Sequence, residues 1–257
     1  GCQWRVNSMA ATASGKDKLL RYARIFVGGY DLSGDALTVD TLDNTIGEAD
    51  TTGWSEFNRN YIRDGRRTSA IRGFQALLND TAGRAYARLV TSPDAIVTMG
   101  LGGGGEPAVP DPAYLIYAAQ MGDTTSFNGN IGMISGDFLP LATQYSDVAI
   151  NPMGHVLQGA TSLSSTTTGS SHDNGAATSN GFHAHLHVLA TSSGNFAITI
   201  EDSTDDSSWS TIATFTSTAG SITAERQTGT GTVERYVRAV LTRTAGTITV
   251  FIAYARN

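Results

Sequence analysis

The chain has 257 residues, with 17 basic and 23 acidic side chains and a formal net charge of −6. Charged residues make up 16% of it, well below the roughly 25% of an average domain, which excludes a coiled coil, a helical bundle and an acidic disordered protein. Its many Gly, Thr and Ser residues favour short strands joined by turns. No apolar stretch approaches the ~20 residues of a membrane-spanning helix. The acidic balance argues against sequence-specific DNA binding, and the single Cys2 excludes an internal disulfide.

After an irregular N-terminal leader, residues 1–20, the sequence predicts a β-rich domain over residues 21–158. Residues 43–69 are polar and are interrupted by glycines, which predicts an extended arm carrying at most one helical turn. Asp80 or Thr81 is a suitable N-cap for a short helix at about 82–90. The strands expected in this domain are 21–28, 69–78, 95–101, 114–121 and 132–139.

The remaining residues divide into a linker and a second β-rich unit. Residues 159–181 are rich in Gly, Ser and Thr and almost free of charge, which is typical of a loop or flexible linker. Residues 182–257 contain strand-like runs separated by turns, with apolar residues at every second position in 196–200 and 248–254. This spacing predicts an antiparallel C-terminal β-sandwich. The expected core includes Phe196, Ile198, Val237, Val250 and Ile252. The fold class is therefore all-β, with antiparallel sandwich or barrel-like sheets, long loops and one short helix.

Three histidines at alternate positions, His183, His185 and His187, are a weak candidate for a metal site. Side chains at i, i+2 and i+4 of a strand project from one face, and imidazole is a common ligand of Zn, Cu and Fe. Successive same-face positions lie about 6–7 Å apart, however, which is too wide for one ion to bind all three. The alternative is a partly exposed strand face, or an aromatic stack at a subunit contact.

The acidic turn containing Asp202, Asp205 and Asp206 is a weak candidate for Ca²⁺. An ordinary hairpin turn, in which Asp side chains accept backbone amides, is the favoured alternative. The glycine run at 100–105 lacks the following helix that a phosphate site needs. No nucleophile elbow is present, so we expect no enzyme, no catalytic residue and no cofactor.

Several segments resemble structural proteins of tailed bacteriophages. The opening RIFVGGYDLSGDALTVDTL is similar to a strand, turn and Thr-rich segment that recurs in those proteins, and AIRGFQALLND resembles the strand that follows it. Near the C-terminus, ITIEDSTDDSSWSTIATF and RYVRAV are similar as well. The resemblance covers most of residues 21–257 and is strongest to the major tail tube protein family. These motifs are structural and transfer no catalytic residue.

The resemblance implies a subunit that assembles, with other copies and other virion proteins, into stacked hexameric rings through which DNA passes without specific binding. It implies a virion location, in the tail or on the capsid surface, and no membrane contact. A capsid decoration or cement protein is the alternative. A glycan-binding virion module is a second alternative, because Trp209 or Tyr236 could stack on a sugar, although Trp209 is also suited to the core. The residues expected to contact a neighbouring copy are Trp54, Phe57, Arg63, Arg66 and Arg67.

Overall fold

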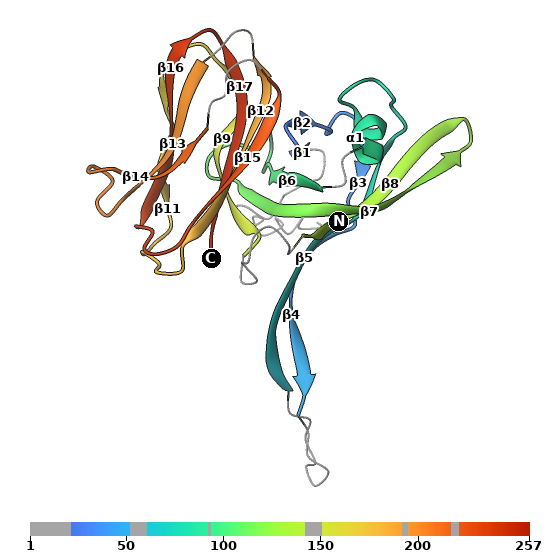
Figure 1. Cartoon of the computed structure of the whole chain (residues 1–257), viewed down its shortest axis with the longest axis horizontal. Helices are drawn as coiled ribbons and strands as arrows, with labels where there is room; N and C mark the ends of the chain where they lie inside the picture. Colours follow the sequence, from blue (N-terminus) through green and yellow to red (C-terminus); the bar gives the residue numbers. More distant parts are fainter. Residues whose placement is uncertain (1–21, 52–60, 92–93, 142–150, 192–194, 217–220) are drawn as a thin grey trace, which may run out of the picture.

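The computed structural model describes residues 22–51, 61–91, 94–141, 151–191, 195–216 and 221–257, which form two antiparallel sheets and one short helix (Figure 1). The all-β prediction is therefore confirmed. Among these residues, no helix has the length and hydropathy needed to cross a bilayer. The expected leader, residues 1–20, lies outside the described residues.

The larger sheet has twelve strands and runs through both halves of the chain. Its main path is β15 (Thr223–Gly229), β12 (Phe182–Thr191), β17 (Ile248–Arg256), β9 (Met153–Leu163), β7 (Pro112–Asn128), β6 (Asp94–Leu101), β1 (Ala23–Val27) and β2 (Tyr30–Asp31). A branch from β7 consists of β8 (Ile131–Pro140), β5 (Tyr61–Leu77), β4 (Thr41–Asp50) and β3 (Ala36–Thr38). The smaller sheet is made of β10 (Thr167–Thr168), β11 (His172–Asp173), β13 (Asn195–Ser203), β14 (Ser210–Phe215) and β16 (Tyr236–Ala245).

The C-terminal sandwich packs the small sheet against the β15–β12–β17–β9 part of the large sheet. Every second residue of β13, β16 and β17 faces the space between them, as the alternation predicts. All five residues named for this core are buried and belong to one cluster: Phe196, Ile198, Val237, Val250 and Ile252.

The segment 159–181 is not a free linker. Its first residues complete β9, where Leu163 pairs with Ile248 of β17. Further along, β10 and β11 both pair with β16. The scarcity of charged and large apolar residues made this stretch resemble a linker, yet its backbone groups extend the small sheet.

A second core lies under the helix α1 (Ala85–Thr91) in the N-terminal half. Ala85 and Leu89 of the helix are buried against strands β1, β5, β6, β7 and β8. The helix begins three residues later than the sequence predicts. Neither Asp80 nor Thr81 caps it directly, because the carboxylate of Asp35, from the β2–β3 turn, accepts the Ala85 amide at 3.2 Å.

The large sheet curls so that its two ends, β15 and β12 at one end and β1 and β2 at the other, lie against each other around a third core. Phe26 of β1 and Phe251 of β17 stack with ring centroids 4.4 Å apart. At the meeting point Gly29, with φ of +88°, lies so close to β15 that a Cβ would be 2.4 Å from the Thr223 carbonyl oxygen. The strands β12 and β17 are consequently buried on both faces. In each strand, one face packs in the sandwich and the other face packs inside the curled sheet.

The β4–β5 hairpin leaves the rest of the molecule as an arm, as expected for residues 43–69, but it is a β-ribbon (Figure 1). At its far end Glu48 is in register with Arg63, and Asp50 with Tyr61. Because a strand rises about 3.3 Å per residue, the ten residues of β4 span roughly 30 Å.

Candidate functional site

The root of the arm is fixed to the body by polar contacts with two strands of the body, β7 and β8. Arg72 of β5 forms an ion pair with Asp43 of β4 at 2.6 Å and lies 3.7 Å from Asp137 of β8. The Tyr114 hydroxyl donates to the main-chain oxygens of Asp43 and Ala70, and burial raises the pKa of this tyrosine above its ordinary value. The direction in which the arm leaves the body is therefore set by the fold.

Along the arm, β4 has one strand edge without a partner. It pairs with β5 alone in the described part of the chain, so the outward edge of ten residues carries backbone groups that no other strand uses. Such an edge is a template for pairing with another chain. The sequence analysis expects five residues within 43–69 to contact a neighbouring copy.

Of those five residues, Trp54 and Phe57 lie outside the described residues. The structure places Arg63, Arg66 and Arg67 in the part of β5 that belongs to the arm. Their side chains lie outside the described part of the structure. Their contact with a neighbouring copy stays a prediction.

A second exposed feature, which the sequence analysis missed, is the tip of the β7–β8 hairpin. Phe127 and Ile131 lie beside its Gly129-Asn130 turn and are 72% and 55% exposed, the most open large apolar side chains described. Leu78 lies against the same tip, since its amide donates to the Gly132 carbonyl at 2.9 Å. The turn signal was visible in the sequence, but its apolar flanks looked like ordinary strand residues.

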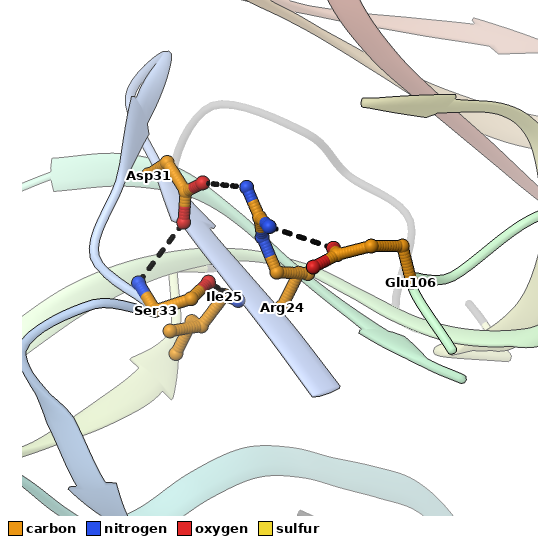
Figure 2. A network of polar contacts seen from close by, with 5 residues as sticks. All are labelled: Arg24, Ile25, Asp31, Ser33 and Glu106. Atoms are coloured by element: carbon orange, nitrogen blue, oxygen red, sulfur yellow. Dashed lines mark hydrogen bonds and ion pairs between the residues drawn. The ribbon is translucent and has the colours of Figure 1, made fainter. Parts of the chain in front are cut away.

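The turn motif at residues 28–35 is held by specific polar contacts (Figure 2). Asp31 accepts the Ser33 amide at 3.0 Å and a guanidinium nitrogen of Arg24. Ser33 in turn accepts the Ile25 amide at 2.9 Å, and Arg24 reaches Glu106 at 2.6 Å. The motif therefore closes the β1–β2 turn and ties it to the end of the glycine run, and it holds no ligand-binding geometry of its own.

The structure corrects the interpretation of the three histidines as a partly exposed face. His183, His185 and His187 are at most 1% exposed and lie on the inner side of the curl. His185 Nδ1 and His187 Nε2 are each 2.9 Å from the Thr98 hydroxyl of β6. Burial lowers the pKa of His187 to about 3. The pKa of His183 is also lowered to about 3, first by burial and then by the nearby charge of Arg226.

The acidic turn between β13 and β14 does not bring its carboxylates together. Asp205 accepts the Ser207 and Ser208 amides at 3.0 and 2.8 Å, and these bonds hold its pKa below the ordinary range. Asp202 instead accepts the Glu234 amide at 2.9 Å, and Asp206 adopts a φ of 59°. Within the described ranges, no three His, Cys, Asp or Glu side chains are grouped as a metal site would require.

The outer face of the small sheet holds both aromatic residues considered for glycan stacking. Trp209 is half-buried there and is not a core residue. The Arg238 guanidinium lies 3.9 Å from its ring centroid and also pairs with Glu201 at 2.7 Å. Tyr236, two residues from Arg238 on the same strand, has Arg235 4.9 Å from its ring centroid. An arginine guanidinium therefore already covers a face of each aromatic ring that was considered for sugar stacking.

No model of a known protein family matches the chain, and no curated protein matches its sequence. Among solved structures, the Dit protein (gp 19.1) of SPP1, named as a hub of the adsorption apparatus in phages infecting Gram-positive bacteria, aligns over 91% of this chain and 99% of its own, with 11% identity and a TM-score of 0.32. A chain from the infectious bursal disease virus Gx strain aligns over 90% and 67%, with 10% identity and a TM-score of 0.25. Similarity at these levels establishes neither a shared family nor a shared function.

Proposed function

We propose that the chain is a structural subunit of a tailed-bacteriophage virion, and specifically a tail tube protein that assembles into stacked hexameric rings around the DNA. The observation that carries the proposal is the β4–β5 arm, which leaves the body as a two-stranded ribbon whose outer edge pairs with no other strand among the described residues. The resemblance of the 24–42 and 70–80 segments to phage structural proteins supports the same assignment.

The arm has the reach that ring assembly requires. A compact chain of this length has a radius of gyration of about 18 Å, whereas the ten residues of β4 alone span roughly 30 Å. An arm of that length extends past its own body into the volume of a neighbouring subunit. Since the root is held by the Arg72–Asp43 ion pair and the Tyr114 hydroxyl, it reaches every neighbour at the same angle, which a repeating ring needs.

The negative net charge of the chain is compatible with a channel that lets DNA pass without binding it. The net charge of −6 repels phosphate, and copies arranged in a ring add to the effect around one channel. Salt limits this repulsion to about 8–10 Å from the wall. DNA would therefore meet a weakly repulsive surface and slide along it, and we propose no catalytic step and no required cofactor.

The test is electron microscopy of the purified chain beside a variant with a shortened arm. Residues 46–67 are replaced by Asn-Gly, which closes a two-residue hairpin on the Thr45–Thr68 pair and leaves the arm root intact. We expect rings or hollow tubes from the unaltered chain and folded monomers, with an unchanged melting temperature, from the variant. Ring or tube formation by the variant would refute the role of the arm.

The same experiment separates the alternatives. A capsid decoration protein would remain monomeric or trimeric and would bind expanded capsids of its phage, which would overturn the tube assignment. The glycan-binding alternative is weaker, because Arg238 lies over the Trp209 ring and a sugar would have to displace it. Binding to a glycan array that is lost in Trp209→Ala would favour that alternative.

A further inference from the structure

The two ends of the curled sheet meet without a strand ladder. In the described residues, β12 pairs only with β15 and β17, and its contact with β2 and β6 is made by side chains. His187 accepts the Gly29 amide at 3.2 Å, and Thr98 bridges His187 and His185. These four residues, together with His183, are called the histidine cluster below. They supply polar contacts between the two ends of the sheet, beside the apolar Phe26–Phe251 stack.

Hydrogen bonding assigns the protons of the cluster. The Gly29 amide donates to His187 Nδ1, so the neutral ring carries its proton on Nε2 and donates it to the Thr98 oxygen. The Thr98 hydroxyl then donates to His185 Nδ1, which leaves the His185 proton on Nε2. A neutral imidazole is required at His187, because a second proton on its Nδ1 would face the Gly29 N–H and leave two donors opposed.

No negative charge in the described residues compensates a proton taken up here. Among the described residues, the charges that act on these rings are the other imidazoles and Arg226 of β15, which is itself 8% exposed. The main-chain carbonyl of Val97 favours the charged form of His185, but the pKa of His185 is still lowered, mainly by burial. His183 bonds to the neutral side chain of Asn257. The remaining wall is formed by apolar residues of the third core, including Phe26, whose ring lies 5.6 Å from that of His187.

We propose that the histidine cluster is an acid-sensitive closure: neutral imidazoles hold β12 and β15 against β2 and β6, and protonation separates these two ends of the sheet. The strands β17, β9 and β7 stay paired on the other side of the curl, so they act as the hinge and both the sandwich and the N-terminal core remain folded. This is a property of the single subunit and does not depend on the proposed function.

The direction and size of the effect follow from proton linkage. In the open state the imidazoles regain an ordinary pKa near 6.5, while burial keeps those of His183 and His187 at about 3 in the closed state. The open state therefore binds more protons between these values, and closure is lost as the pH falls below about 6.5. Between pH 7 and pH 5 the open-to-closed ratio rises about 25-fold for each histidine, and roughly 10⁴-fold for three.

The test is hydrogen exchange of the full chain at pH 7 and pH 5, read by mass spectrometry on the peptide that contains Gly29 and corrected for the intrinsic pH dependence of exchange. We expect the protection factor of this peptide to fall up to about 10⁴-fold, while peptides from the β13 strand keep theirs. In the double variant His185→Gln/His187→Gln one titrating ring remains, so the fall should shrink to about 25-fold.

The matched control is His172→Gln. His172 lies in the small sheet and its pKa is also lowered, to about 4, mainly by burial, but it does not contact the cluster, so the Gly29 peptide should respond to acid as in the unaltered chain. A further variant, Thr98→Val, keeps all three rings and removes the bridge, and should open at a higher pH. Equal protection of the Gly29 peptide at both pH values, or its loss together with that of the β13 peptides, would overturn the proposal.

Discussion

Replacing Ile198 with alanine tests the placement of the sandwich core most directly. Ile198 is fully buried on β13, where it is in register with Phe215 of β14 and Leu241 of β16. The substitution removes three buried carbons, worth about 2.4 kcal/mol at ~0.8 kcal/mol each. The cavity left among large neighbours adds to this, which gives a loss of about 3–4 kcal/mol, inside the range of roughly 2–5 seen for such substitutions.

Urea unfolding followed by tryptophan fluorescence measures this loss, since Trp209 lies on the same sandwich. With a denaturant slope of about 3 kcal/mol per molar urea for a chain of this size, the midpoint should fall by about 1 M at an unchanged slope. The matched control is Ile222→Ala, because Ile222 is 43% exposed and its truncation should change stability by less than about 0.5 kcal/mol. If Ile198→Ala loses no more than Ile222→Ala, the core assignment is wrong.

Two further substitutions test contacts that connect distant parts of the chain. Asp35→Ala removes the acceptor of the Ala85 amide and should cost about 2 kcal/mol, seen as faster hydrogen exchange in the first turn of the helix; unchanged exchange there would contradict the capping role. Gly29→Ala combines a positive φ with a collision against the Thr223 carbonyl and should lower stability by more than about 2 kcal/mol. Gly104→Ala is its control, because a Cβ there meets nothing within 4 Å, and equal melting temperatures for the two variants would refute the close approach.

Local pattern was enough to predict much of the fold. Alternation of apolar residues identified the sandwich strands, because successive side chains of a strand point to opposite faces of its sheet and every second one reaches the sandwich core. The glycines and polar residues of 43–69 indicated an arm, since such a segment has too little apolar surface to join a core. Both features depend on residues that are close together in the sequence, so the sequence by itself was sufficient to predict the sandwich strands and the arm.

Contacts between distant residues decided the rest. Alternating histidines on a strand look half-exposed, yet His185 is buried because the sheet curls and gives β12 a second covered face. The helix begins at Ala85 and not at the predicted residue 82, because the residue that accepts its first amide, Asp35, lies fifty residues earlier in the chain. Trp209 lies outside the core, on the outer face of the small sheet, where Arg238 of β16 covers its ring. In each case the deciding partner is remote in sequence, and a periodicity reports which side of a strand a residue occupies but not what the fold places against that side.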